Sequence, residues 1–111
     1  MQCGGKMNFI ELIEKNISQN QMLDNWSVAG QIRVKQYRFI GIGNTHSECY
    51  LQNPKTEKTY TVTENDFQFL YKHWKNYKEG IITRHELRDM NNSTTYIICI
   101  MHYLEEMNLI K

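Results

Sequence analysis

Apolar residues recur at helical spacing over residues 8–17, which predicts a helix with one apolar face. We expect this helix to begin at Asn8, whose side chain is a suitable N-cap, with Glu11 three residues later completing the capping pattern. Polar residues 18–21 interrupt the pattern. We expect the helix to end there and to restart in a second apolar cluster at residues 22–26.

The pattern changes to a period of two from Gln31, where apolar and polar residues alternate as in a strand with one solvated face. Two further strands are predicted at residues 48–52 and 58–63, the second of them rich in Thr, Tyr and Val. Residues 41–44 and 53–56 contain the Gly, Asn and Pro that favour turns. Because these connections are short, we expect an antiparallel meander.

The last third of the chain has the pattern of three helices. Thr63 or Asn65 is expected to cap the first of them, and Gly80 to end it in the position where glycine is common. Thr83 and Glu86 have the spacing of a capping box for a short second helix. An Asn-rich break precedes a final amphipathic helix.

These elements predict an α+β fold with an N-terminal helix, a three-stranded antiparallel meander and a C-terminal three-helix unit packed on the sheet. Residues 1–7 are expected to be a flexible leader. Residues 8–111 are expected to form a single α+β domain, since a chain of 111 residues has one domain by default.

Composition and charge exclude several classes of protein. Hydrophobic residues make up 41% and charged residues 23%, which is typical of a folded globular chain. The net charge of +1 gives no overall attraction to nucleic acid or to anionic lipid. Three cysteines cannot close a disulfide framework, and no apolar run is long enough to span a bilayer. We therefore expect a cytoplasmic protein that does not contact membranes.

The order of helix, glycine, short capped helix, Asn-rich turn and longer helix over residues 66–110 resembles the helix-turn-helix core of winged-helix proteins. The stretches 82–87, 93–97 and 103–110 carry the resemblance. In that family the last of the three helices enters the major groove of DNA. The resemblance implies a nucleic-acid-associated accessory factor. However, residues 89–110 contain no Lys or Arg, and such cations normally supply much of the affinity for DNA.

The resemblance also implies which side chains would touch nucleic acid. These are Lys72, Lys75, Arg84, Arg88, Asn92, Thr94 and Thr95. The basic side chains would neutralise phosphates, and the amide and hydroxyl groups at the start of the last helix would reach bases or phosphates. The alternative is an ordinary three-helix unit that covers the sheet.

A second nucleic-acid hypothesis uses the predicted sheet, where basic residues alternate with tyrosines that can stack on unpaired bases. The basic residues are Arg33, Lys35, Arg38, Lys55 and Lys58, and the tyrosines are Tyr37, Tyr50 and Tyr60. Arg33, Lys35 and Tyr37 share a face by strand alternation. The alternative is the solvated face of a half-buried sheet.

Cysteine and histidine positions raise two weaker hypotheses. His46 with Cys49, and Cys99 with His102, each have a spacing of three that a zinc site would use. Cys99 nevertheless lies among apolar residues, as a buried thiol does. Because no catalytic motif is present, we expect no catalysis, no metal and no cofactor. The histidines that would have to meet a carboxylate in a cleft of an enzyme are His73, His85 and His102.

The helix after residue 66 is apolar on more than one face, which is typical of a central helix or of an interface. With Trp26, Tyr96 and Tyr103, this excess of aromatic surface predicts a homodimer or a protein partner. The sequence thus favours a small non-catalytic binding protein. The alternatives are a protein-interaction module of the antitoxin or inhibitor kind and an enzyme without a recognisable motif. In general character the chain is similar to small uncharacterised proteins of bacterial mobile gene cassettes and phages.

Overall fold

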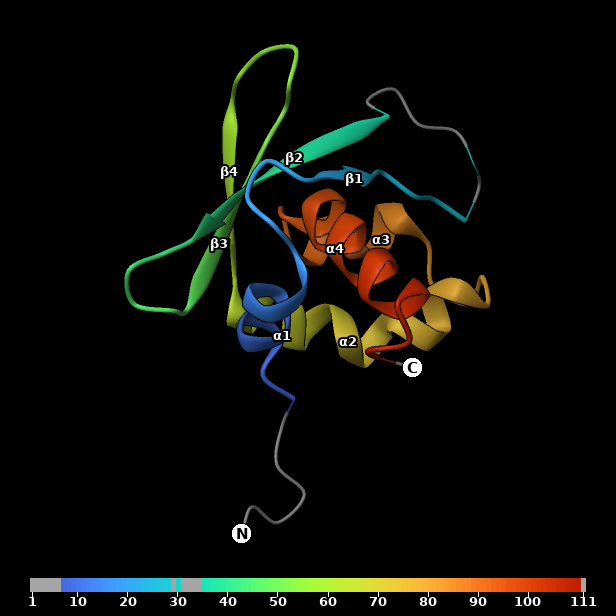
Figure 1. Ribbon diagram of the computed structural model, residues 1–111. Helices are drawn as coiled ribbons and strands as arrows, with labels where there is room; N and C mark the ends of the chain where they lie inside the picture. Colours follow the sequence, from blue (N-terminus) through green and yellow to red (C-terminus); the bar gives the residue numbers. More distant parts are fainter. Residues whose placement is uncertain (1–6, 29, 31–34, 111) are drawn as a thin grey trace, which may run out of the picture.

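The computed structural model describes residues 7–28, 30 and 35–110. Its elements follow in the order α1 Phe9–Asn16, β1 Met22–Asp24, β2 Gln36–Ile42, β3 Glu48–Gln52, β4 Thr59–Thr63, α2 Glu64–Lys78, α3 Arg84–Met90 and α4 Thr94–Glu106. The strands form one antiparallel sheet in the order β1-β2-β3-β4, and the helices lie on one side of it (Figure 1). The predicted α+β class is confirmed.

The sheet has four strands where the sequence predicts three. Residues 22–24, expected to restart the first helix, form β1, in which Leu23 pairs with Tyr37 of β2. Leu23 is buried while Asp24 is exposed, so the alternation of a strand applies over these three residues. An apolar cluster this short is compatible with a helix or with a strand. It forms a strand here because it pairs with β2, which is distant in sequence.

The turn expected at residues 41–44 begins two residues later, because β2 continues through Ile42. A bulge between Phe39 and Gly41 shifts the register against β3, and Gly41 has a φ of 156° that other residues rarely adopt. The turn starts at Gly43, whose N–H donates to Glu48 O at 2.8 Å. Residues 31–34, at the start of the first predicted strand, lie outside the described residues.

The predicted helix caps are confirmed. Asn8 Oδ1 accepts a hydrogen bond from Glu11 N at 3.0 Å at the start of α1. Thr63 forms a capping box with Asp66 at the start of α2, and Thr83 forms one with Glu86 at the start of α3. Gly80 follows the end of α2 with a φ of 78°. Each cap depends on neighbouring residues alone, which is why local sequence predicts it.

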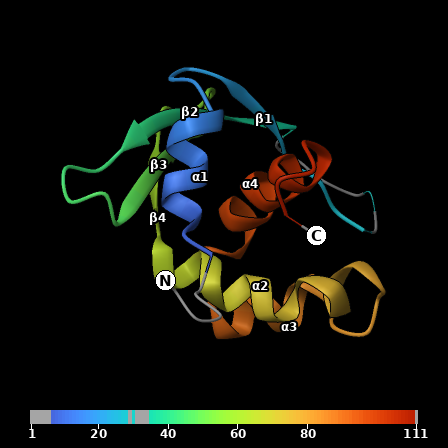
Figure 2. The ribbon, with the colours of Figure 1, turned by 60° about the horizontal axis from the view of Figure 1, so that its bottom comes forward.

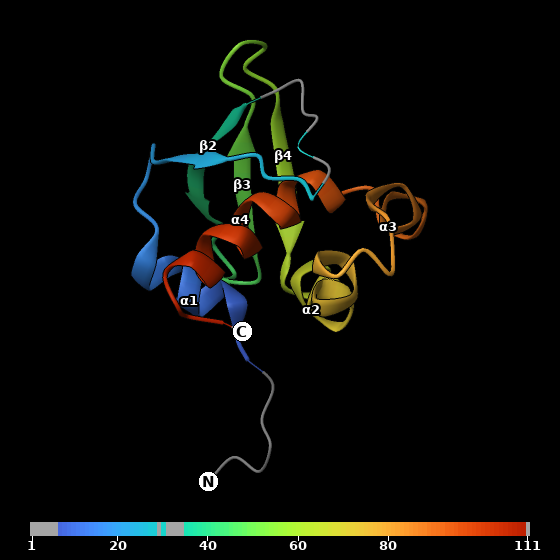
Figure 3. The same ribbon diagram turned by 90° about the vertical axis from the view of Figure 1, so that its right-hand side faces the viewer.

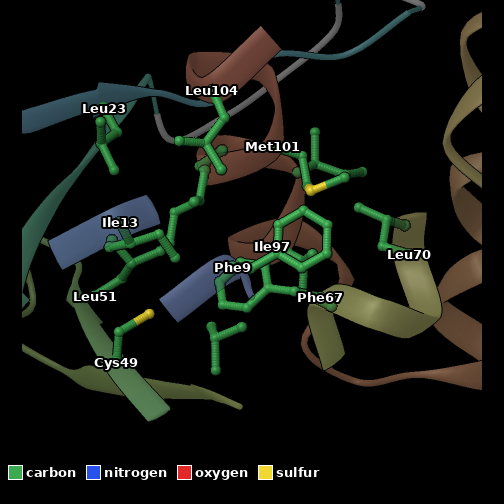
Figure 4. Close-up of a cluster of buried hydrophobic side chains, with 14 of the residues drawn as sticks. Phe9, Ile13, Leu23, Cys49, Leu51, Phe67, Leu70, Ile97, Met101 and Leu104 are labelled. Atoms are coloured by element: carbon green, nitrogen blue, oxygen red, sulfur yellow. The ribbon is translucent and has the colours of Figure 1, made fainter. Parts of the chain in front are cut away.

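Helix α4 lies at the centre of the molecule, between the sheet and α2 and beside α1 (Figure 2). Its residues 97–101 are all fully buried, so this part of the helix has no solvent-facing side. Figure 4 shows Ile97, Met101 and Leu104 of α4 among apolar side chains from α1, α2 and the sheet. Although α4 is apolar on all sides there, it has only 13 residues, too few to span a bilayer. No helix in the described part of the chain is long and apolar enough to cross a membrane.

A carboxylate of α2 fixes the beginning of α1. Glu64 accepts hydrogen bonds from Phe9 N at 3.1 Å and from Ile10 N at 2.8 Å, two of the N–H groups that a helix start leaves unpaired. Gln68 donates from Nε2 to the Met7 carbonyl at 2.5 Å. Met7 is half-buried and packs against the core, although it was expected to belong to the leader. The rest of that leader lies outside the described residues.

Candidate functional site

The chain leaves β1 and crosses α4 toward α3 as residues 25–28, here called the strap (Figure 3). Asn25 N donates to Lys35 O at 2.9 Å, which extends the pairing of β1 with β2 by one residue. Val28 N donates to the hydroxyl of Tyr77 in α2 at 3.3 Å. The strap is therefore attached at one end to the sheet and at the other to α2.

Arg84, the first residue of α3, attaches the middle of the strap. Its Nη1 donates to the carbonyl oxygen of Trp26 and its Nη2 to Oδ1 of Asn25, both at 2.9 Å. Both acceptors are neutral. Among the described residues, no carboxylate lies within ion-pair distance of this guanidinium. Arg84, which the winged-helix resemblance placed on a phosphate, thus uses two of its nitrogen atoms to hold the strap.

The side chain of Trp26, a strap residue, belongs to an aromatic cluster beneath the strap backbone. Its ring stacks on the His102 imidazole with centroids 4.6 Å apart and an interplanar angle of 3°. The edges of Trp74 and Tyr77 approach the same ring, each with its centroid 5.9 Å away. Trp74 is only 1% exposed, whereas Trp26 is half-buried and reaches the surface. Three ring contacts thus hold the side chain of Trp26 in position.

The first hollow lies on one side of the strap and has a volume of about 400 Å³. It is lined by Asp24, Asn25, Trp26, Ser27, Gly30, Lys35, Gln36 and His102. His102 Nε2 is 3.6 Å from Glu106 Oε1, so one of the histidines named above does meet a carboxylate beside a hollow. Within the described part of the chain, however, no hydrogen bond joins His102 to Ser27 or to Asp24, whose carboxylate accepts from Gln36. No proton relay to a nucleophile is assembled there.

The second hollow borders the strap at Ser27 and Val28 and has a volume of about 180 Å³. It is lined by Ser27, Val28, Tyr77, Gly80, Ile82, Thr83 and Arg84. Ser27 lines both hollows, so they adjoin across the strap. Val28 is 46% exposed at the rim, and Ile81, between two lining residues, is 67% exposed. Large apolar side chains thus meet solvent beside a largely apolar depression.

The structure separates the residues that the winged-helix resemblance placed on DNA. Thr94 is fully buried, and its hydroxyl donates to Asn91 O at 2.7 Å, so it is not available for contact. α4 is enclosed over residues 97–101, so only the residues at its start are placed where they could reach a groove. The other residues of the set keep some exposure: Lys72, Lys75, Arg88 and Asn92 are exposed, and Thr95 is half-buried. Nucleic-acid contact by these exposed residues stays a prediction.

The predicted basic and aromatic patch on the sheet is divided between its two faces. Tyr37 is buried on the helix side, where burial raises its pKa, and Tyr60 stacks on Tyr96 of α4 with centroids 4.1 Å apart. Tyr50 lies on the opposite face, where its hydroxyl donates to the Glu48 carboxylate. Lys35 lines the first hollow, and Arg33 lies outside the described residues.

The cysteines of the weak zinc hypothesis are both buried in the core. Cys49 and Cys99 are 0% exposed, and burial raises the pKa of each thiol to about 12. His46 is exposed and lies 3.7 Å from Glu14. Across the described ranges, no group of three or more His, Cys, Asp or Glu side chains is placed to hold a metal ion.

Comparison with protein-family models, with curated proteins and with solved structures gives no match for this chain. The sequence singled out Trp26 only as part of an aromatic excess, and His102 only as a possible metal ligand or catalytic histidine. The roles of Asn25 and Val28 had no local pattern, because they arise from contacts with α2 and α3, which are distant in sequence.

Proposed function

We propose that this protein is a non-catalytic binding module that holds a segment of a partner protein on the surface formed by the strap and its two hollows. The observation that carries the proposal is the exposure of Val28 and Ile81 beside an already formed apolar hollow. Exposed apolar side chains next to a depression are typical of protein-interaction sites.

The size of the second hollow favours a side chain over a cofactor. Its volume of about 180 Å³ lies below the roughly 300–1,000 Å³ that is usual for small-molecule sites. A single aliphatic or aromatic side chain is smaller than such a ligand and remains attached to a longer segment. The adjoining first hollow then provides room for the neighbouring residues of that segment.

The site is also rigid before binding. Arg84 and Tyr77 hold the strap by hydrogen bonds, and Trp26 is stacked on His102. A site that is already ordered loses little conformational entropy when a partner binds, which favours affinity. This preorganisation supports a binding role for the strap over a purely connecting one.

A random peptide library displayed on phage and selected on the immobilised full-length protein tests the proposal. Enriched peptides, made synthetically, are then titrated against the wild type and Val28→Asp. We expect Val28→Asp to weaken binding by about tenfold or more, because a charge replaces an exposed apolar contact. Thr61→Asp, at an exposed position of β4, is the matched control and should leave affinity unchanged. Failure to enrich any peptide, or equal affinity for Val28→Asp, would refute the proposal.

A second candidate function, nucleic-acid association, is supported by the exposed cations of α2 and α3. Lys72, Lys75 and Arg88 are exposed, and none of them has an ion-pair partner among the described residues. The test is fluorescence anisotropy with duplex and single-stranded DNA over a salt series. Lys72→Glu with Lys75→Glu should weaken binding and reduce the dependence of the affinity on salt concentration. Unchanged affinity in this variant would end the hypothesis.

The predicted homodimer receives less support than the sequence suggested. Much of the aromatic surface of α2 that predicted an interface is buried inside the molecule: Phe67 is 0% exposed, Trp74 1% and Tyr77 2%. A homodimer that used the strap would bury Val28 in both copies. Sedimentation velocity of the wild type and of Val28→Asp measures this directly, and a monomer in both samples excludes it.

A further inference from the structure

Among the described residues, Arg84 is the only charged one that lines the second hollow. The remaining lining consists of the apolar side chains of Val28 and Ile82, the ring of Tyr77, two hydroxyl residues and a glycine. An apolar depression with one cation at its wall has a definite chemical preference. It accommodates an apolar group that has a negative charge beside it.

In the described part of the molecule, no carboxylate lies within ion-pair distance of Arg84. Its two hydrogen bonds reach a carbonyl oxygen and an amide oxygen, which carry no net charge. The carboxylates of α3 are engaged elsewhere, since Glu86 belongs to the capping box and Asp89 lies 3.6 Å from His85. Burying part of a guanidinium without a counter-charge is unfavourable, and an incoming anion would remove that cost.

Arg84 also keeps hydrogen-bonding capacity for such an anion. A guanidinium has five N–H donors in one plane, and two of its nitrogen atoms make the bonds to the strap. Its plane is fixed by those bonds, so the remaining donors are already oriented. Guanidinium groups bind carboxylates strongly when they are oriented in this way.

We infer that the segment bound at the strap presents an aliphatic or aromatic side chain to the second hollow and a carboxylate, from an Asp or Glu close to it in sequence, to Arg84. This inference rests on the proposed function and specifies the chemistry of the partner. The apolar side chain supplies most of the buried area, and the carboxylate supplies the selectivity.

A double-mutant cycle tests the inference with the tightest peptide from the selection described above. Each Asp and Glu of the peptide is replaced in turn by Asn or Gln, and each peptide is titrated against the wild type and Arg84→Gln. We expect one replacement to weaken binding to the wild type by about tenfold, which charge-assisted hydrogen bonds make reasonable. The same replacement should change affinity for Arg84→Gln by less than about twofold.

Arg88→Gln is the matched control, because Arg88 lies one helical turn from Arg84 on α3, is exposed and does not line the hollow. For the Arg88→Gln variant, replacing the peptide carboxylate should weaken binding as much as it does for the wild type. Arg84→Lys, which keeps the charge, provides a second variant if Arg84→Gln disturbs the strap. If Val28→Asp weakens binding but no carboxylate matters, or if the cycle is additive, the inference fails while the proposed function stands. If no peptide is enriched, the proposed function itself fails.

A small probe tests the same chemistry without any selected peptide. 3-Phenylpropionate and its uncharged amide are each titrated into ¹⁵N- and methyl-labelled protein and followed by NMR. We expect the carboxylate to shift the methyl signals of Val28 and Ile82 and the Nε–H signal of Arg84, at a concentration about tenfold lower than the amide requires. Equal affinities for the two probes, or shifts at other sites only, would overturn the inference.

Discussion

At the scale of single residues, one carboxylate joins α2 to α4. The Trp74 indole is 1% exposed, and its Nε1 donates to Glu105 Oε1 at 2.5 Å. The other oxygen, Oε2, accepts from Lys78 Nζ at 2.8 Å, and this ammonium lies 5.6 Å from the centroid of the Trp74 ring. Glu105 thus satisfies a buried N–H and pairs with a cation at the same time, which keeps the ring beneath the strap in place.

Replacing Glu105 with Ala should leave the Trp74 N–H without its acceptor and lower the free energy of unfolding by about 1–3 kcal/mol. Glu106→Ala is the control. That carboxylate is 66% exposed, and its distance of 3.6 Å from His102 is longer than a hydrogen bond. We expect the control to change stability by less than about 1 kcal/mol. Urea unfolding followed by tryptophan fluorescence measures both variants, and equal losses would contradict the role given to Glu105.

At the scale of elements, side chains accept hydrogen bonds from the unpaired N–H groups at the helix starts. The starts of α3 and α1 differ in how far away in sequence these side chains lie. α3 is capped by its own residues, through the box of Thr83 and Glu86. α1 is completed by Asn8 locally and by Glu64 from α2, 55 residues away from Phe9. A local cap fixes where a helix begins, whereas the distant carboxylate also fixes where α1 lies against α2.

Glu64→Ala should remove the contact that attaches the start of α1 to α2. We expect a loss of about 1–3 kcal/mol in stability, because two N–H groups lose a charged acceptor. Hydrogen exchange of the α1 amides should accelerate more than that of α4. Asn65→Ala, the exposed neighbour, is the control. Unchanged exchange at Phe9 and Ile10 in Glu64→Ala would show that the carboxylate is dispensable.

The capping box of α3 predicts a pH dependence. Hydrogen bonds from the Thr83 backbone and hydroxyl hold the pKa of Glu86 below its ordinary value of 4.5. A lowered pKa in the folded state means that the contribution of Glu86 to stability is present above pH 4.5 and is lost as the pH falls through the lower value. Glu86→Gln should therefore melt below the wild type at pH 7, and the difference should be smaller at pH 3.

Thermal unfolding at both pH values tests this expectation for Glu86. Asp89→Asn removes another exposed carboxylate from α3 without touching the box, and it serves as the control. A gap between wild type and Glu86→Gln that persists unchanged at pH 3 would exclude the capping carboxylate as its source.

At the scale of the whole molecule, sheet and helices share one core, and its two thiols report on the integrity of that core. Cys49 lies in β3 and Cys99 in α4, and burial raises the pKa of each to about 12, from an ordinary value of 9.0. A raised pKa means that the thiol keeps its proton up to a higher pH in the folded state than in the unfolded state. This part of the stability is therefore complete below pH 9 and is lost as the pH rises toward 12.

In a Cys3→Ser background, we expect no thiol to react with Ellman's reagent at pH 8 under native conditions and both remaining thiols to react in urea, because only the exposed thiolate is nucleophilic. The urea midpoint should fall as the pH rises above 9. Rapid reaction of the native protein at pH 8 would show that the core opens far more readily than its packing indicates.

The sequence by itself determined the features that depend on neighbours along the chain. The α+β class, the positions of the helices and the caps at Asn8, Thr63 and Thr83 follow from periodicity and from side chains within three residues of the backbone they bond. Gly80 belongs to the same group, since a φ of 78° selects glycine locally. These features require no knowledge of what the elements pack against.

Only the tertiary structure decided the fourth strand, the central position of α4 and the surface proposed for binding. β1 exists because β2 pairs with it, and Thr94 is buried because the sheet and helices enclose α4. The candidate site depends on Arg84 reaching the strap across 58 residues of sequence. Burial and long-range pairing are properties of the assembled chain, so the periodicity of any one segment does not contain them.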